Sequence, residues 1–507
     1  MISLIHSIAV NGLSSNIIEV EVDINSGLSS FTIVGLADQA VQESKERIRS
    51  ALKSSFAKLP TTRITVNLAP ADIRKAGPSF DLPIAIGILV SDEVIQEKKL
   101  LDSSIFIGEL ALDGKLRKVS GVLPATIGAK ENGFKRIFIP KENIKEASIV
   151  DGIEVIGVEN LLELIDILNF KKEYEIAEKI DIKTLKKSIS EKYDFSYVIG
   201  QEYAKRALTV AAAGGHNIIM NGPPGSGKTM LAKTLKTILP DLNLEESIEI
   251  SKIYSISGLL TTENPIIVDR PFRTVHHTAS SISIIGGGRN AKPGEISLAH
   301  KGVLFFDEVL EFQKTVLEVL RQPLEDGSIT VNRVNSTYTY PAKFMFVGAM
   351  NPCPCGFLTD PKKECICSQN DILKYRARLS GPLIDRIDIF IEVPKVETEK
   401  FGNDAKKGET SLEIKSKVEK ARDMQLKRFV GTNYTFNSEM GSKDIEKYCI
   451  LDSETEKVLK QAVNSLDLSA RSYYRVLKLA RTIADLEGSE NIKMNHLLEA
   501  LGFRKKD

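Results

Sequence analysis

The sequence predicts an α/β protein whose central part is a parallel sheet carrying a phosphate-binding loop. Between residues 195 and 393, short apolar segments at 217–220, 303–306 and 343–348 alternate with helical patterns, as in a parallel sheet with crossover helices. The first apolar segment leads into a complete G-x-x-x-x-G-K-[ST] motif, and the second ends in two carboxylates. Strand, loop and helix follow one another in the order that nucleotide binding requires.

Composition limits the class of protein. A chain of 507 residues is long enough for two or three domains. Its 68 basic and 67 acidic side chains nearly cancel, so contact with nucleic acid would need a local basic patch. The apolar runs are shorter than a membrane span, and no charged n-region with an apolar h-region opens the chain. We expect a soluble cytoplasmic protein with no membrane partner.

The parts flanking the central unit have different patterns. Residues 1–168 are expected to form an α/β domain, with alternating strands at 17–23 and 63–68 around a helix at 38–56. Helices at 82–90 and 123–130 and strands at 105–107 and 136–139 follow. Residues 169–194 are rich in Lys and Glu and are predicted to be a linker. Residues 394–507 are predicted to form a helical lid, in which residues 473–487 have one apolar face.

The glycine-rich loop has the chemistry of a triphosphate site. Its glycines permit a turn whose backbone N–H groups point at an anion, and the positive end of the following helix dipole faces the same point. Lys228 supplies a charge for the β- and γ-phosphates, and the Thr229 hydroxyl suits Mg²⁺. The nucleotide-binding residues of this loop are Gly222, Pro223, Pro224, Gly225, Ser226, Gly227, Lys228 and Thr229.

Polar residues at the ends of the next two predicted strands complete an ATPase site. Asp307 can hold Mg²⁺ and Glu308 can polarise the attacking water, because ligands of open α/β sheets bind at the carboxyl ends of the strands. Asn351, after the following strand, can position that water; as part of Asn-Pro it is also a turn signal. Arg386 and Arg471 can neutralise charge on a transferring phosphoryl group, or each can form a surface ion pair.

Four of the five cysteines lie within fifteen residues, in the pattern C-x-C-x₉-C-x-C. Cys353, Cys355, Cys365 and Cys367 could bind Zn²⁺ tetrahedrally, although C-x-C is tighter than the usual C-x₂-C pair. Redox sensing and plain reduced thiols remain as alternatives. A metal directly after Asn351 would fix the loop that carries it.

These motifs together resemble the AAA+ ATPases of the helix-2-insert clade. The resemblance rests on the glycine-rich loop, Val303–Phe306 with its two carboxylates, Asn351, residues 383–386 and Ser469-Ala470-Arg471. More narrowly, residues 271–278, 286–289, 293–300 and 351–356 resemble the ComM/YifB family of magnesium-chelatase-like proteins, over essentially the whole chain. The resemblance implies a homohexameric ring motor that uses ATP and Mg²⁺ to move DNA branches, in some bacteria during natural transformation.

The same resemblance implies roles for individual residues. Asn351 matches sensor 1, Arg386 the arginine finger that acts on the neighbouring subunit, and Arg471 sensor 2 in the lid. Val198, Ile199 and Gly200 match the segment that flanks the adenine.

Two insertions are predicted to contact DNA. Residues 272–293 match the helix-2 insert, and residues 328–340 alternate as a hairpin that matches the pre-sensor-1 hairpin. In a ring, a few basic and polar groups per subunit would track a phosphate backbone. The hairpin could instead only pack on its neighbour, and the histidines could be structural. The predicted DNA-binding residues are Arg273, His276, His277, Arg289, Lys292 and Arg333.

The N-terminal domain resembles the catalytic domain of Lon proteases, which has the ribosomal S5 domain 2-like fold. Residues 75–79 match the stretch that carries the nucleophilic serine of that family, here Ser79. The matching lysine position falls on Leu123, which cannot accept the serine proton. We therefore expect a non-proteolytic, ring-forming or DNA-binding module, with substitution by Lys115, Lys118 or Lys130 as the alternative.

The sequence thus favours an ATP-driven DNA motor with helicase or branch-migration activity. A magnesium-chelatase-type motor acting on a protein or metal-insertion partner is the main alternative. An ATP-dependent protease and a DNA-binding scaffold that uses ATP only to assemble are two further hypotheses.

Overall fold

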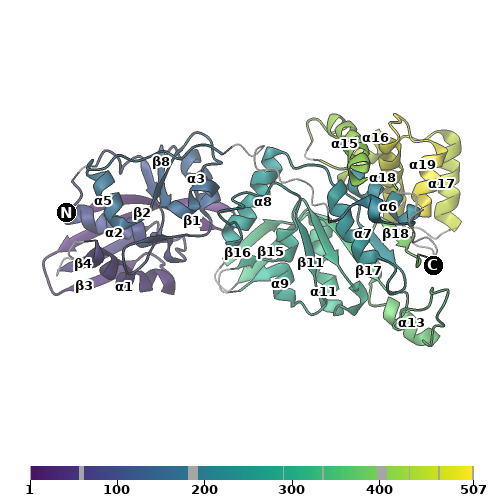
Figure 1. Ribbon diagram of the computed structural model, residues 1–507, viewed down its shortest axis with the longest axis horizontal. Helices are drawn as coiled ribbons and strands as arrows, with labels where there is room; N and C mark the ends of the chain where they lie inside the picture. The colour runs from purple at the N-terminus through teal and green to yellow at the C-terminus, as the bar shows by residue number, and fades with distance from the viewer. Residues whose placement is uncertain are drawn as a thin grey trace.

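The computed structural model describes residues 2–55, 62–96, 98–180, 192–288, 291–333, 336–396, 408–432, 434–465 and 469–504. Three parts follow one another along the long axis of the molecule (Figure 1): an N-terminal α/β domain, a central domain with a parallel sheet, and a C-terminal helical domain. Within the described residues, the helices are all too short or too polar to span a bilayer.

The N-terminal domain contains two main sheets. One has the strand order β1-β2-β4-β3, and the other has the parallel order β5-β8-β9. The strands of the two sheets and of a short hairpin are β1 (Ser3–Asn11), β2 (Ser14–Asn25), β3 (Ser30–Val34), β4 (Arg63–Ala69), β5 (Ser104–Phe106), β6 (Glu109–Leu110), β7 (Leu116–Arg117), β8 (Arg136–Pro140) and β9 (Glu154–Val158). The helices are α1 (Gln39–Ser54), α2 (Asp81–Ser91), α3 (Val122–Glu131), α4 (Ile144–Ala147) and α5 (Leu161–Leu168).

Alternation and capping explain why these segments adopt their predicted types. In β2, Ile18, Val20 and Val22 are fully buried while the residues between them are more exposed, so one face of the strand covers the core. Asp38 caps α1 by accepting a hydrogen bond from the Val41 N–H (3.0 Å). The predicted strands and helices of this domain are confirmed to within a few residues at each end.

The central domain is built on one five-stranded parallel sheet with the order β11-β14-β17-β10-β18. Its strands are β10 (Ile218–Asn221), β11 (Phe272–Val275), β14 (Val303–Phe306), β17 (Met345–Met350) and β18 (Ile389–Glu392). The accompanying helices are α6 (Glu202–Gly214), α7 (Lys228–Leu235), α8 (Leu244–Ser257), α9 (Ser281–Ile285), α10 (Glu295–Leu298), α11 (Lys314–Val319), α12 (Arg321–Asp326), α13 (Gln369–Arg376) and α14 (Gly381–Ile384).

Successive side chains of this sheet enter two different cores. Ile218, Met220 and Phe305 pack with α6, α7 and the helical domain, whereas Ile219 and Phe306 pack with the helices of the other face. All five side chains are fully buried. A sheet covered on both faces accounts for the continuous apolar runs in the sequence.

The C-terminal helical domain shares the first of these cores. Its helices are α15 (Ser411–Arg428), α16 (Ser442–Tyr448), α17 (Ser453–Ser465), α18 (Ala470–Leu486) and α19 (Met494–Gly502). Buried polar contacts attach α15 to α6, since Gln425 Nε2 donates to the Ala213 carbonyl oxygen (2.9 Å). A movement of the helical domain would therefore be transmitted through α6 to the sheet that carries the phosphate loop.

The N-terminal domain contacts the central domain through α8 and a hairpin of β15 (Ser328–Arg333) and β16 (Ser336–Pro341) (Figure 1). The Gly121 N–H donates to the Ser255 carbonyl oxygen (3.1 Å), and the Ser255 hydroxyl donates to the buried carboxylate of Glu146 (2.5 Å). Tyr338 on the hairpin donates its hydroxyl to Asn11 Oδ1 (3.4 Å). The hairpin predicted to contact DNA is thus joined to the N-terminal domain.

The predicted insertion at 272–293 begins later than expected. Residues 272–275 form β11, an edge strand of the main sheet, because they pair in parallel with β14. Only the segment after β11, with α9, β12 (Gly286–Gly287) and β13 (Lys292–Pro293), stands apart from that sheet. The predicted linker at 169–194 has neither helix nor strand over its described residues, 169–180 and 192–194.

Candidate functional site

The glycine-rich loop joins β10 to α7 at the carboxyl edge of the main sheet. Gly225 and Gly227 have positive φ angles of 77° and 88°, which favour glycine. A Cβ at Gly222 would lie 2.2 Å from the Val393 carbonyl oxygen, so the neighbouring backbone leaves no room for a side chain. The loop therefore needs its glycines both for its turns and for its close packing.

Lys228, the first residue of α7, is held over the loop. Its Nζ donates to the carbonyl oxygens of Gly222 (2.7 Å) and Pro223 (3.0 Å) and lies 3.4 Å from Asn351 Oδ1. Burial lowers the pKa of Lys228 to about 8, while the nearby charges of Asp307 and Glu308 raise it. A phosphate group at this point would favour the charged form of the lysine.

Thr229 and Asp307 meet beside the lysine. The Thr229 hydroxyl donates to Asp307 Oδ2 (2.9 Å), and the other carboxylate oxygen accepts from the Glu308 N–H (3.1 Å). A hydroxyl and a carboxylate are the oxygen ligands that Mg²⁺ prefers beside a triphosphate. The donor set therefore fits that ion.

Glu308 lies just beyond the end of β14. Its backbone is left-handed, with φ +53° and ψ +50°, which is unfavourable for a non-glycine residue and occurs often at functional sites. Its carboxylate is half-exposed, and Oε2 lies 3.6 Å from Nδ1 of His277. The carboxylate is thus accessible to water and in contact with the segment that follows β11.

Asn351 follows β17, the strand that lies between β10 and β14 in the sheet. Gly222 N–H donates to the Met350 carbonyl oxygen (3.2 Å), which brings the end of β17 against the phosphate loop. The sheet therefore brings together Lys228, Thr229, Asp307, Glu308 and Asn351 at the ends of three adjacent strands.

Arg386 and Arg471 lie together, at a different place from the phosphate loop. Both guanidinium groups pair with the carboxylate of Glu325, Arg471 at 3.5 Å, and Arg386 also donates to the Pro382 carbonyl oxygen (2.7 Å). Burial lowers the pKa of Arg386, and the positive charge of Arg471 lowers it further. Over the described part of the chain, no hydrogen bond or ion pair joins either arginine to residues 222–229.

The segment matched to the adenine site packs between the phosphate loop and the start of the helical domain. Val198 is buried, and a Cβ at Gly200 would lie 3.9 Å from Val396. Gln201 Nε2 donates to the Pro394 carbonyl oxygen (2.6 Å) and lies 3.4 Å from that of Ser226. Val198, Ile199 and Gly200 are therefore adjacent to the site, and their contact with adenine stays a prediction.

The predicted DNA-binding residues occupy several environments. Arg273 lies on β11 and binds the Glu295 carboxylate with two hydrogen bonds (2.6 and 2.7 Å). The His276 and His277 rings are in contact with their centroids 4.2 Å apart and their planes tilted by 33°, and Lys292 on β13 is exposed. Arg289 and the side chain of Arg333 lie outside the described residues. The insertion and the hairpin are joined, because the Tyr340 hydroxyl donates to the Ala291 carbonyl oxygen (2.9 Å).

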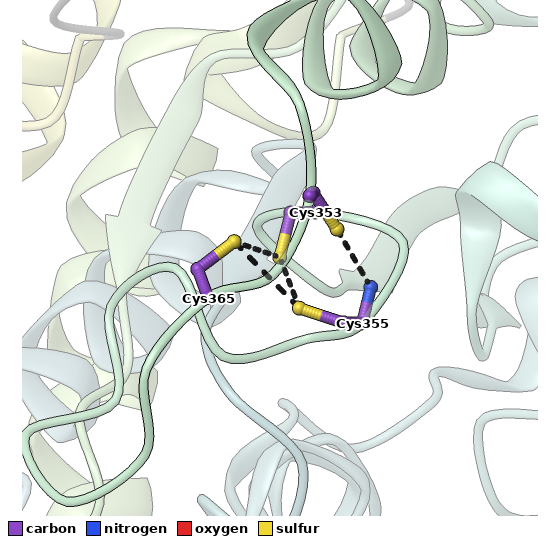
Figure 2. A group of neighbouring side chains, drawn as sticks. Cys353, Cys355 and Cys365 are labelled. Atoms are coloured by element: carbon purple, nitrogen blue, oxygen red, sulfur yellow. Dashed lines mark hydrogen bonds between the residues drawn. The ribbon is translucent and has the colours of Figure 1, made fainter.

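The four clustered cysteines come together in the loop between β17 and α13 (Figure 2). All four sulfur atoms lie within 4.8 Å of one another.

In the N-terminal domain, Leu123 is buried in α3, and the described residues contain no hydrogen bond between Ser79 and a lysine.

Sequence reasoning missed two partners of the site residues. Glu325 holds Arg386 and Arg471 in one place, and His277 lies against Glu308. Nothing in the pattern around Glu325 marks it, since it is an ordinary helix residue of α12. The position of His277 follows from the pairing of β11 with β14, which the sequence did not predict.

Comparison with known protein families agrees with this geometry. The family described as magnesium chelatase, subunit ChlI, matches residues 194–401. The description subunit ChlI of Mg-chelatase matches residues 20–143, and magnesium chelatase, subunit ChlI C-terminal, matches residues 408–504.

Individual relatives extend over the whole chain. The competence protein ComM of Haemophilus influenzae is 43% identical over 506 residues, which cover 99% of this chain and 97% of that protein. YifB of Escherichia coli is 40% identical over 506 residues, which cover 100% of this chain and 97% of that protein. Lon protease 2 of Bacillus subtilis is 28% identical over 183 residues, 32% of each chain.

Proposed function

Since the chain belongs to the magnesium-chelatase-like family of AAA+ ATPases that includes ComM and YifB, we propose that it is an Mg²⁺-dependent ATPase that forms a ring and moves DNA. The observation that carries the ATPase part is the meeting of Lys228, Thr229, Asp307 and Asn351 at one edge of the sheet. Lys228 lies near Asn351 after β17 and Thr229 bonds to Asp307 after β14, contacts that a surface turn without function would not require.

Each group in the site has a role in phosphoryl transfer. Lys228 and the loop N–H groups bind the phosphates, and Asn351 and Glu308 orient and polarise the attacking water. Thr229 and Asp307 would hold Mg²⁺, which neutralises charge on the β- and γ-phosphates when bound. His277 contacts Glu308 and can hold this carboxylate until the insertion moves.

The placement of the two arginines supports ring assembly. Arg386 and Arg471 are gathered at Glu325 and do not contact the phosphate loop of their own chain. Both would then act on nucleotide bound to a neighbouring subunit, where an arginine finger contributes about 10³–10⁵ to the turnover rate. The sequence predicts that Arg471 reaches the phosphates from the lid. Because Arg471 lies beside Arg386, we infer that it acts on nucleotide bound to the neighbouring subunit and not on nucleotide bound to its own chain.

Two features support DNA as the moved substrate. The insertion and the hairpin are joined to each other, and His277 connects the start of the insertion to Glu308. Lys292 is exposed on this insertion, and a ring would present one such lysine from each subunit to a phosphate backbone. The name of the relative ComM, a competence protein, is consistent with DNA handling during transformation.

The test is the rate of ATP hydrolysis with no DNA, with single-stranded DNA, with duplex and with a four-way junction. Lys228→Ala serves as the blank. We expect stimulation by DNA, largest on the junction, and a smaller effect as salt is raised. Lys292→Glu should weaken this stimulation, while Lys443→Glu, the same charge reversal at an exposed position of α16, should not.

A chelatase-type motor is the second candidate, because the three family descriptions that match the chain all refer to subunit ChlI of magnesium chelatase. ATP hydrolysis that no DNA stimulates would favour this reading. The insertion and the hairpin would then be binding surfaces for a protein partner.

A further inference from the structure

We propose that Cys353, Cys355, Cys365 and Cys367 bind one zinc ion, and that this centre fixes the loop between β17 and α13, which carries Asn351 and packs on the phosphate loop. The zinc site stands on the cysteine geometry alone. Its effect on nucleotide binding rests on the ATPase function proposed above.

The sulfur geometry fits a single tetrahedral ion. The Sγ atoms of Cys353, Cys355 and Cys365 are 3.4, 3.6 and 3.6 Å apart (Figure 2), and Cys367 completes a group within 4.8 Å. Four thiolates at about 2.3 Å from Zn²⁺ are separated by about 3.8 Å along the edges of the tetrahedron. These separations are too long for a disulfide, in which the sulfurs are about 2.05 Å apart.

The chain around the cysteines has no buried apolar core of its own, and an ion pair between Asp360 and Lys395 ties it to the segment after β18. No apolar residue from 357 to 368 is buried, although the structure describes the whole segment. Leu358 and Ile366 are exposed, Ile366 by 89%. Segments that cannot bury an apolar core are commonly held by a metal, and four cysteines in two C-x-C pairs supply the ligands.

The same loop touches the nucleotide site on two sides. Gly356 packs on the phosphate loop so closely that a Cβ there would lie 2.7 Å from the Pro224 ring. Arg376 of α13 donates to the Pro352 carbonyl oxygen (3.3 Å), directly after Asn351. Both contacts depend on the path of the chain between the two C-x-C pairs.

A further contact reaches the segment after Glu308. Tyr375 of α13 donates its hydroxyl to Glu311 Oε1 (2.8 Å), and Arg378 donates to the Leu310 carbonyl oxygen (2.7 Å). Because α13 follows Cys367 directly, loss of the metal would loosen α13 and the Asn351 loop together. We expect weaker nucleotide binding as the result.

The experiment measures metal content first, without ATP. The full-length protein, purified without added zinc and dialysed, should contain one zinc ion per chain by elemental analysis. Cys355→Ser and Cys365→Ser should lose it. Cys449→Ala, at the fifth cysteine, buried in the helical domain, should retain it. The assignment would be overturned if the wild-type protein contained no zinc or contained iron in its place. It would also be overturned if all five cysteine thiols reacted rapidly with a thiol reagent.

The second measurement concerns fluorescent-nucleotide affinity. We expect about tenfold weaker nucleotide binding in Cys355→Ser, equivalent to about 1.4 kcal/mol, because the loop that packs on Pro224 would lose its metal. If that variant does not fold, zinc can be released from the wild type by an organomercurial, with circular dichroism as the check on folding. Zinc present but nucleotide affinity unchanged after its removal would refute the coupling to the phosphate loop.

The two proposals fail separately. Zinc bound by a protein that hydrolyses no ATP would leave the zinc site intact and refute the proposed function. ATP hydrolysis by a wild-type protein that contains no zinc would support the proposed function and refute the zinc site.

Discussion

Arg386 allows a direct test of whether the active site is shared between subunits. Its guanidinium is held by Glu325 and the Pro382 carbonyl oxygen of its own chain, away from the phosphate loop. If it serves a neighbour, Arg386→Ala should lower the turnover rate about 10³–10⁵-fold, equivalent to about 4–7 kcal/mol of transition-state stabilisation. Glu325 is half-exposed and keeps its pairing with Arg471, so this change leaves no buried charge unpaired.

The decisive measurement mixes two inactive variants. In a ring of Lys228→Ala and Arg386→Ala subunits, a site is complete when the nucleotide is held by an Arg386→Ala subunit and the arginine comes from a Lys228→Ala neighbour. At a 1:1 ratio each condition holds for half of the subunits, so about one quarter of the sites should be complete. Steady-state ATP hydrolysis of the mixture should therefore recover to about a quarter of the wild-type rate if the sites act independently.

The control is a mixture of Lys228→Ala with Glu308→Gln subunits. Both side chains belong to the same site at the edge of one sheet, so no combination of these subunits completes a site. A mixture of Lys228→Ala and Arg386→Ala that stays as inactive as this control would refute the action of Arg386 across the interface.

Three further predictions concern the nucleotide site. Because burial lowers the pKa of Lys228 to about 8, nucleotide affinity should fall as the pH rises from 7 to 9. Nucleotide binding at pH 8 should be accompanied by uptake of about half a proton, since the lysine is half protonated before binding. Calorimetry in buffers of different ionisation enthalpy measures this uptake. Glu308→Gln should keep nucleotide binding but lose about 10²–10⁴-fold in steady-state hydrolysis, because an amide cannot accept the proton of water. Gly356→Ala should weaken nucleotide binding, since its φ of +83° costs an alanine about 1–2 kcal/mol and its Cβ would clash with Pro224.

Each of these has a matched comparison. Lys228→Arg removes the titrating group, so any residual affinity should no longer vary between pH 7 and 9; an unchanged pH profile would contradict the assignment to Lys228. Gly431→Ala has the same φ of +83° but open space around its Cβ, so it incurs the backbone cost without touching the phosphate loop. Equal nucleotide affinities in the two glycine variants would show that contact with Pro224 is unimportant. Hydrolysis near the wild-type rate in Glu308→Gln would exclude Glu308 as the base.

Local patterns alone were sufficient to predict several of the strands and the phosphate loop, although β1, β3, β9 and β11 were not predicted. Alternation in β2, the apolar run of β14 and the glycines at 222, 225 and 227 reflect requirements of single elements or single turns. The meeting of Asp307 with Thr229 could also be predicted, because parallel strands end at one edge of the sheet. These features depend on short stretches of chain and on a general rule of α/β folds.

Only the tertiary structure decided which distant groups meet. Residues 272–275 were expected to begin an insertion, and their pairing with β14 instead makes them a sheet strand that brings His277 to Glu308. Glu325 comes between Arg386 and Arg471 although it is far from both in sequence, because packing and not local pattern sets that contact. The spacing of the cysteines favoured zinc but left redox sensing and plain reduced thiols as alternatives, and the folded loop brought the four sulfurs within 4.8 Å of one another. Periodicity specifies the type of an element, whereas contacts between elements depend on strand order and packing, which the sequence encodes only through the whole fold.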